Sequence, residues 1–258
     1  MAIISITSDW GIKDHYLAAV KGSIHTHIPN AEIIDVSHNI PSFDLNQTSF
    51  IIRNSYKYFP KGSIHIIGVK SDASIKTPHT AVLYDGHYFI GADNGIFSLI
   101  FDHDPEKIVE IDIIQDSDSF TFSTRDVFVM AAAHIAKGEP IENLGILKES
   151  LMQKMSFAPV LEKNTIKGKV IYVDTYENLI TNITEATFRQ QLGKKAFSIV
   201  FRTPGYIISK ISKSYDDVPE GEMLALFGSG GHLEIAINLG KASSLLGVHI
   251  DDIVRIEF

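Results

Sequence analysis

Short apolar runs alternate with helix-like segments along the first half of this chain, and that alternation is the strongest constraint on its fold. Residues 3–6, 33–36 and 63–69 have the β-branched, apolar character of buried strands. Residues 15–27 and 44–58 lie between them and carry apolar side chains at helical spacing. Strands that alternate with helices form a mostly parallel sheet covered on both faces. The pattern therefore predicts an α/β domain over residues 1–150.

The rest of the first half adds two local signals. A hairpin is predicted for residues 81–84 and 87–90 around Asp85-Gly86, and a helix over residues 125–137 that ends near Gly138.

The second half has a different pattern, with short strand candidates and little helix between them. The candidates are residues 166–173, 198–201, 206–211, 223–227, 232–237 and 253–258. Such spacing is typical of an antiparallel, barrel-like β-domain. We expect this small all-β domain to span residues 165–258, after a join at residues 148–164 where periodicity lapses and Pro159 appears.

Composition excludes several classes of protein. The chain has 258 residues, a formal net charge of −8 and no cysteine, so disulfides, thiolate zinc sites and cysteine nucleophiles are excluded. An acidic chain without a basic run is a poor nucleic-acid or anionic-membrane binder. The eleven histidines lack metal-ligand spacing, so we expect no metal and no cofactor. Without a signal peptide or a membrane-spanning run, a cytoplasmic protein is predicted.

Two carboxylates follow the first predicted strand. Asp9 comes just after it, and Asp14 lies in the turn before the first helix. Open α/β sheets bind ligands at the carboxyl ends of their strands. Carboxylates accept hydrogen bonds and attract cations, so a hydroxylated or cationic ligand suits this position. The alternative is that both residues only cap the helix.

Three polar turns are further candidates, each with a structural alternative. Residues 121–126 either cap the following helix or offer its N-terminus to an anion. Residues 174–182 form either a plain turn or a site where the Asn178 amide matches a nucleobase edge. Residues 228–231, Gly-Ser-Gly-Gly, form either a hairpin loop or a set of bare amides for a carboxylate. Tyr176 or Tyr215 could stack on a base or fill the core.

Taken in order, these segments resemble one known family along essentially the whole chain. The blocks are Thr7-Ser8-Asp9-Trp10-Gly11 with Asp14-His15-Tyr16 and Lys21-Gly22, Ile34-Asp35-Val36-Ser37-His38, Gly91-Ala92-Asp93-Asn94-Gly95, Thr121-Phe122-Ser123-Thr124-Arg125-Asp126, Val173-Asp174 with Asn178-Leu179-Ile180-Thr181-Asn182-Ile183, and Gly228-Ser229-Gly230-Gly231-His232-Leu233-Glu234-Ile235-Ala236. Together they resemble the family of S-adenosyl-L-methionine hydrolases (SAM hydroxide adenosyltransferases), fluorinase and chlorinase.

The resemblance implies an N-terminal α/β domain, a C-terminal β-barrel domain and a homotrimer. The nucleoside site would lie between the first domain of one subunit and the second domain of its neighbour. On the first domain, Asp9 would hold the ribose hydroxyls, Asp14 the methionine amino group, and Phe43 would wall the pocket.

On the second domain, the resemblance places the base and the methionine carboxylate. Asn178 would contact adenine, with Asp174 and Ile180 nearby and Tyr215 at an aromatic position of the base pocket. Ser229 would contact the carboxylate.

The chain departs from the family at the residues thought to prepare the attacking water. The hydrolases carry an Asp-Pro-Gly-Val-Gly loop, a downstream Arg and a His before the Gly-Arg-Asp block. Here Lys70 stands at the Asp position, Thr77 at the Arg position and Ser123 at the His position. Asp72 or His79 could compensate. Loss of a general base costs on the order of 10²–10⁴ in rate.

Three functions remain open. The first is cleavage of S-adenosyl-L-methionine by water at C5′, giving adenosine and L-methionine. The second is halide transfer, because Thr124 stands where the halogenases carry the serine that contacts the halide. The third is a protein that binds the nucleoside or S-adenosyl-L-methionine without catalysis.

Overall fold

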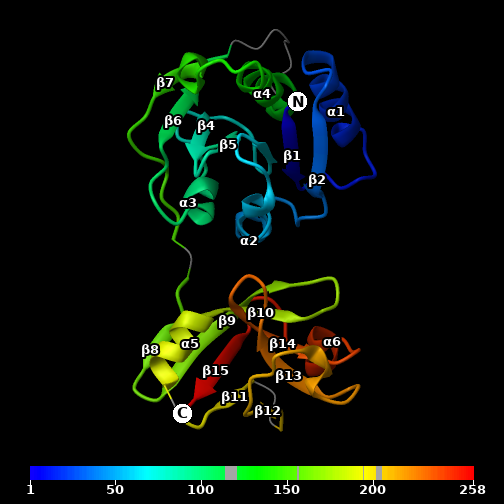
Figure 1. Cartoon of the computed structure of the whole chain (residues 1–258), viewed down its shortest axis with the longest axis vertical. Coiled ribbons are helices and arrows are strands. Elements are labelled where there is room, and N and C mark those ends of the chain that lie inside the picture. The colour runs from blue at the N-terminus through cyan, green and yellow to red at the C-terminus, as the bar shows by residue number, and fades with distance from the viewer. Residues whose placement is uncertain (114–120, 156, 194, 202–204) are drawn as a thin grey trace. The chain divides into compact units, whose positions relative to one another are not determined.

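Two units make up the chain in a computed structural model, which describes residues 1–113, 121–155, 157–193, 195–201 and 205–258. The first unit spans Met1–Ser156 and the second spans Phe157–Phe258 (Figure 1). Each unit has its own buried apolar core and is described by itself.

The first unit is built on a seven-stranded sheet. Its strands, in spatial order, are β2 (Glu32–Ser37), β1 (Ile3–Ser8), β3 (Ile64–Gly68), β5 (His87–Ala92), β4 (His79–Tyr84), β6 (Lys107–Ile111) and β7 (Gly145–Leu147). β1 lies between β2 and β3 in two parallel ladders, and β3 pairs in parallel with β5. The carboxyl ends of these four strands therefore meet at one edge.

The sheet is mixed, which corrects the prediction of a mostly parallel sheet. β4 pairs antiparallel with both β5 and β6, and β6 pairs antiparallel with β7. The cause is local, because a two-residue turn at Asp85-Gly86 joins β4 to β5 and leaves no room for a crossover helix. Both turn residues have positive φ, 50° and 71°, as tight hairpin turns require.

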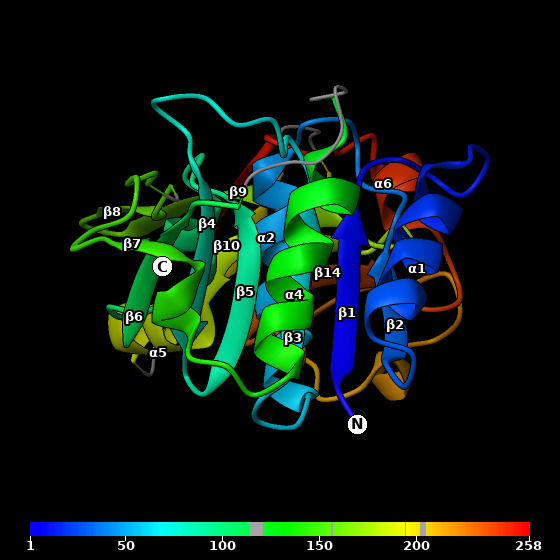
Figure 2. The ribbon, with the colours of Figure 1, turned by 90° about the horizontal axis from the view of Figure 1, so that it is seen from above.

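Helices cover both faces of this sheet. They are α1 (Tyr16–His27), α2 (Leu45–Arg53), α3 (Ile96–Ile100) and α4 (Val129–Ala136), with single turns η1 (Tyr56–Tyr58), η2 (Thr124–Phe128) and η3 (Ile141–Leu144). Alternate residues of β1 and β3 face α1 and α4 through one apolar cluster, and a second cluster joins α2 and α3 to the other face. Figure 2 shows α1 and α4 on the same face.

Two predicted helices differ from the prediction in their detail. The segment predicted as one helix over residues 44–58 divides into α2 and η1, because the Ser55 hydroxyl donates to the carbonyl of Ile51 at 2.9 Å where the helix ends. The helix predicted over residues 125–137 begins as the π-type turn η2 and continues as α4.

Polar contacts fix two parts of the first unit. Inside the core, Ser5 Oγ lies 2.6 Å from His65 Nδ1, and His65 Nε2 lies 3.3 Å from His87 Nδ1. Near the end of the unit, the backbone N–H of Met152 donates to both carboxylate oxygens of Asp93, at 3.0 Å each. Burial raises the pKa of the Asp93 carboxyl, against the effect of this hydrogen bond.

The second unit is a nearly closed antiparallel barrel, as predicted. Its strands follow the order β12 (Ile207–Ile208), β11 (Ser198–Val200), β15 (Ile253–Glu257), β9 (Thr165–Val173), β10 (Leu179–Thr184), β14 (His232–Ile237) and β13 (Met223–Phe227), with β8 (Val160–Glu162) added to β9. A bridge between Ile211 and Ala225 brings the two ends of the path together. Helices α5 (Glu185–Leu192) and α6 (Ala242–Leu246) and the turn η4 (Tyr215–Asp217) complete the unit.

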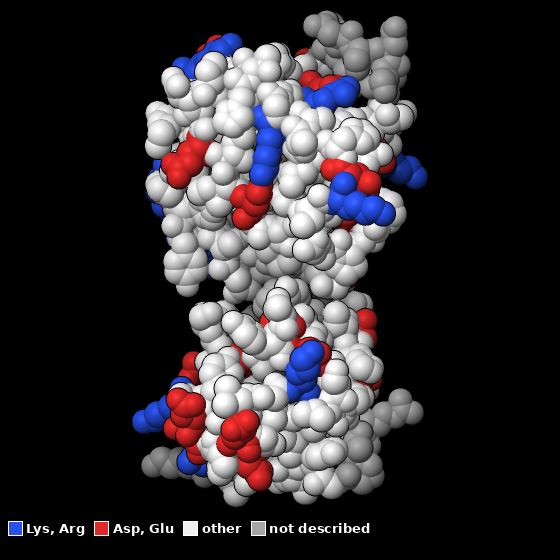
Figure 3. Space-filling view, turned by 90° about the vertical axis from the view of Figure 1, so that its right-hand side faces the viewer, with Lys and Arg blue, Asp and Glu red and all other residues white. Residues whose placement is uncertain are grey.

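The surface carries both signs of charge. On the face shown in Figure 3, most basic side chains lie beside acidic ones. Within the described ranges, none of the helices has both the length and the apolar character needed to cross a bilayer. The same residues contain no group of three or more potential metal ligands.

Candidate functional site

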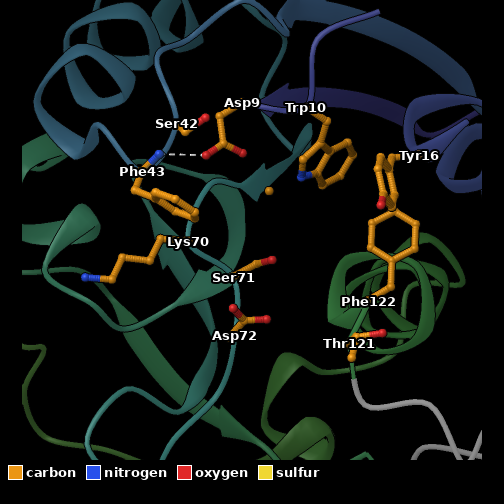
Figure 4. A pocket seen from close by; sticks show the side chains of 11 residues that line it. Asp9, Trp10, Tyr16, Ser42, Phe43, Lys70, Ser71, Asp72, Thr121 and Phe122 are labelled. Atoms are coloured by element: carbon orange, nitrogen blue, oxygen red, sulfur yellow. Dashed lines mark hydrogen bonds between the residues drawn. The ribbon is translucent and has the colours of Figure 1, made fainter. Parts of the chain in front are cut away.

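A pocket of about 400 Å³ opens at the carboxyl edge of β1 and β3 in the first unit. This volume lies within the usual range for small-molecule sites, about 300–1,000 Å³. Its walls come from the segments that follow β1, β2 and β3 and from the turn before η2 (Figure 4). The lining residues are Asp9, Trp10, Tyr16, Ser42, Phe43, Gly68, Lys70, Ser71, Asp72, Thr121 and Phe122. A pocket at the strand ends of an α/β sheet is the location predicted from the sequence.

Asp9 and Phe43 are joined across this pocket. The backbone N–H of Phe43 donates to Asp9 Oδ2 at 2.8 Å. Phe43 has a φ of 65°, and its side chain is 67% exposed. The next residue, Asp44, caps α2 by accepting from the backbone N–H groups of Asn46 and Gln47. The start of α2 thus places an aromatic ring and a fixed carboxylate at the pocket.

A contact between buried Ser8 and buried His38 lies beneath Asp9. Ser8 Oγ lies 2.7 Å from His38 Nδ1, and His38 Nε2 lies 3.0 Å from Asp35 Oδ1. The Ser8–His38 contact is a hydrogen bond, whereas the contact of His38 Nε2 with Asp35 is close in distance without hydrogen-bond geometry. The carbonyl of His38 also accepts from the backbone N–H of Gly11 at 2.7 Å. His38 therefore contacts the chain on both sides of Asp9, through Ser8 before it and Gly11 after it.

Three aromatic side chains form the opposite wall. The rings of Trp10 and Tyr16 each meet Phe122 edge-on, with centroids 5.4 Å apart. A Cβ at Gly68 would lie 2.4 Å from the Trp10 ring, so a residue without a side chain is needed there. Aromatic faces of this kind attract cations.

Lys70 lines the pocket, but its side chain extends away from Ser71 and Asp72 (Figure 4). Its backbone is left-handed, with a φ of 48°. The side chain of Asn94 donates to the carbonyl of Lys70 at 2.9 Å and holds this turn.

The other residues predicted as catalytic lie apart from the lining. Thr124 is fully buried, and its hydroxyl donates to Ser71 Oγ at 3.3 Å. Ser123 is 4% exposed. Thr77 pairs with Ser74 in a local turn, where their hydroxyl oxygens lie 2.7 Å apart. Asp14 is exposed in the turn before α1.

In the second unit, Asp174 and Asn178 are locked together. Asp174 Oδ1 accepts from the backbone N–H of Asn178 at 2.8 Å, and Oδ2 accepts from its side-chain amide at 3.0 Å. The Asn178 side-chain oxygen and its second amide hydrogen are not used by this pair. The turn predicted at this place is therefore present, and recognition of a base by Asn178 stays a prediction.

Glu234 lies against two of the predicted positions, Tyr215 and Ile180, and against the loop that carries Ser229. Its Oε1 accepts from the Tyr215 hydroxyl at 2.6 Å, and it stands opposite Ile180 in the ladder between β10 and β14. A Cβ at Gly228 would lie 2.8 Å from Glu234 Oε2, next to Ser229 in the loop. Burial raises the pKa of the Glu234 carboxyl. Residues 228–231 form the predicted hairpin loop between β13 and β14.

Sequence reasoning assigned no role to several of these residues. These residues are Glu234 and His38, together with Trp10 and Ser71, which line the pocket. A usable signal was present for Glu234, since a lone carboxylate within the apolar strand His-Leu-Glu-Ile-Ala-Ile requires a partner when buried.

Comparisons with known proteins agree with this geometry. Residues 4–145 match the SAM hydroxide adenosyltransferase N-terminal domain, and residues 168–255 match the C-terminal domain of the same family. The chain is 30% identical to an (R)-S-adenosyl-L-methionine hydrolase from Thermus thermophilus, with 96% of each chain covered. It is 22% identical to a fluorinase from Nocardia brasiliensis over 92% of this chain and 90% of the relative.

A solved structure shares the whole fold. An uncharacterized conserved protein from Thermotoga maritima superposes with a TM-score of 0.90 at 30% identity, and the match covers 99% of this chain and 100% of that one. The order of the family blocks, the strand-edge pocket and both domain matches confirm the resemblance seen in the sequence. The chain belongs to the SAM hydroxide adenosyltransferase family.

Proposed function

We propose that this protein cleaves S-adenosyl-L-methionine with water, giving adenosine and L-methionine. The observation that carries the proposal is the strand-edge pocket, where a carboxylate faces an aromatic wall in a chain of this family. Relatives named (R)-S-adenosyl-L-methionine hydrolase match along almost their full length. Water adds to C5′, the C5′–S bond breaks, and its electron pair leaves on sulfur as a neutral thioether. One proton is released, and the departing thioether requires no general acid, metal or cofactor.

In the first unit, we assign Asp9 to the ribose hydroxyls. Its Oδ2 already accepts from the Phe43 backbone, so Oδ1 remains as the stronger acceptor for a hydroxyl. Phe43, Trp10 and Tyr16 supply flat apolar surface, which suits a nucleoside beside a sulfonium cation. Asp14 is assigned to the methionine amino group, as the resemblance implies.

In the second unit, we assign Asn178 to the adenine edge. Asp174 fixes its amide, and Glu234 fixes the ring of Tyr215. Ile180 lies beside them, and Ser229 is assigned to the methionine carboxylate. As the resemblance implies, we propose that these groups meet in a homotrimer, where each site takes residues from two neighbouring copies.

Catalysis without the usual water-preparing residues depends on positioning. Lys70 directs its side chain away from Ser71 and Asp72, and Thr77 and Ser123 are not pocket-lining residues. Holding the substrate and water in line, away from bulk solvent, supplies much of the barrier reduction. We therefore expect slow but detectable turnover.

The test is incubation of the purified protein with S-adenosyl-L-methionine, followed by chromatography for adenosine and methionine. Trp10 is the single tryptophan of the chain and lines the pocket, so quenching of its fluorescence reports binding independently of turnover. Adenosine from the wild type and its loss in Asp9→Asn support hydrolysis. Binding without any product supports a non-catalytic binding protein instead. A 5′-halogenated nucleoside formed with chloride or fluoride would support halide transfer.

The shared site has its own test. Asp9→Asn and Asn178→Ala should each be inactive as pure proteins. If one site takes Asp9 from one copy and Asn178 from its neighbour, mixed trimers contain some sites with both native residues. Refolding the two variants together should therefore restore part of the activity. A monomer by light scattering, or no recovery in mixed trimers, would refute the shared site.

A further inference from the structure

We propose that Asp72 is the catalytic carboxylate that orients the attacking water and takes its proton. The inference rests on the proposed hydrolysis of S-adenosyl-L-methionine. It assigns the water-preparing role to a residue two positions beyond Lys70, on the same loop.

Two carboxylates, Asp9 and Asp72, are among the residues that line the pocket, and within the described residues only Asp9 accepts a hydrogen bond. Asp9 Oδ2 accepts from the backbone of Phe43. Among the residues that the structure describes, none donates a hydrogen bond to the Asp72 carboxylate. Figure 4 shows Asp72 beside Ser71, with Trp10, Tyr16 and Phe122 on the other side of the space. Asp72 is exposed, and no group in the described part of the chain occupies its oxygens, so both can accept from a bound water.

The loop that carries Asp72 is held from three sides. Asn94 binds the carbonyl of Lys70 at 2.9 Å, where the backbone is left-handed. His79 Nε2 lies 3.0 Å from the carbonyl of Ser71, and the hydroxyl of Thr124 donates to that of Ser71. Burial lowers the pKa of His79, so it is neutral near pH 7 and its Nε2–H donates to this carbonyl. These contacts fix the segment just before Asp72 in place.

The redistribution of charge during the reaction determines where a carboxylate can stabilise the transition state. The sulfonium loses its positive charge in the transition state, so a carboxylate at sulfur would stabilise the substrate more than the transition state. The water oxygen gains positive charge as its bond to C5′ forms. A carboxylate beside the water therefore lowers the barrier.

The step balances in atoms and charge. The water oxygen donates an electron pair to C5′, the C5′–S pair leaves on sulfur, and a water proton passes to an Asp72 oxygen. Asp72 then releases that proton to solvent.

The first experiment compares Asp72→Asn with the wild type and with Asp104→Asn. Asp104 is an exposed carboxylate outside the pocket lining and serves as the matched control. We expect kcat of Asp72→Asn to fall by about 10²- to 10⁴-fold, the usual effect of removing a general base. KM should stay within about threefold, because the effect is confined to the transition state. Asp104→Asn should match the wild type.

The second experiment replaces the nucleophile in Asp72→Ala. Azide carries no proton to remove, so added azide should restore turnover and give 5′-azido-5′-deoxyadenosine. Trp10 quenching verifies that the variant folds and binds substrate. No azide product from a variant that still binds substrate would overturn the proposal.

The outcomes separate this inference from the proposed function. Adenosine from the wild type with undiminished kcat in Asp72→Asn overturns the role of Asp72 and leaves hydrolysis standing. A raised KM with unchanged kcat also overturns it, because Asp72 would then act in substrate binding. If the wild type binds substrate but forms no adenosine, hydrolysis and the role of Asp72 both fail.

Discussion

Gly68→Ala tests the link between the end of β3 and the pocket. The new Cβ would lie 2.4 and 2.7 Å from two carbons of the Trp10 ring. Favourable carbon contacts are about 3.5–4.0 Å, so the ring must move by roughly 1 Å. Overpacking of this size costs about 1–3 kcal/mol. For a unit of this size, that corresponds to a Tm lowered by about 2–12 °C. Displacement of Trp10 should also disturb its edge contact with Phe122 and weaken ligand binding.

The assay is thermal and urea unfolding followed by the fluorescence of Trp10. Gly22→Ala is the matched control, because its Cβ would meet nothing within 4 Å inside α1. Alanine in place of glycine within a helix should stabilise it by about 0.5–1 kcal/mol. If Gly68→Ala kept wild-type stability and an unchanged emission spectrum, the close approach to Trp10 would not constrain this position.

Three further predictions follow from the described contacts. Burial raises the pKa of the Glu234 carboxyl above 4.5, so ionising this group lowers the stability of the folded protein as pH rises. Glu234→Gln keeps an oxygen that can accept from Tyr215 but carries no charge. Calorimetry should therefore show a higher Tm for this variant at pH 7 and no increase below pH 4.5. Burial, and to a smaller extent His87, lowers the pKa of His65 from 6.5 to about 3. The free energy of unfolding should therefore be highest above pH 6.5 and fall with acidification by up to about 1.4 kcal/mol per pH unit. A urea midpoint that does not change between pH 6.5 and 5 would contradict this. Asp44→Ala removes the N-cap of α2 and should lower the free energy of unfolding in urea by about 1 kcal/mol. A decrease of less than roughly 0.3 kcal/mol, which is about the error of such measurements, would show that the cap is dispensable.

Local patterns were enough to predict most elements but not how they pair. The alternation of strand and helix signals located β1, α1, β2 and β3, because each buries a face of characteristic period. The Asp85-Gly86 turn could also be predicted, because the conformation of a tight turn depends mainly on its own residues. β6 and β7 lie beyond β4 because they pair at the edge of the sheet that β4 leaves open. A short sequence pattern does not show at which edge of a sheet a strand will pair.

The site was predictable where chemistry and topology coincide. Asp9 follows a central parallel strand, so its place at the pocket could be inferred from the strand order alone. Thr77 and Ser123 were predicted by matching positions along the chain, and the structure places them outside the lining. The position of Asp72 depends on the left-handed backbone at Lys70, and a lysine in the sequence does not predict this conformation.

The bond between Asp93 and Met152 determines how the first unit could be produced alone. A fragment cut at residue 150 would lack the amide that both oxygens of Asp93 accept. It would keep a buried carboxylate without this donor, which costs about 1–3 kcal/mol. Any expression fragment or fusion should therefore include Met152, since the segment that leaves the sheet is part of what stabilises it.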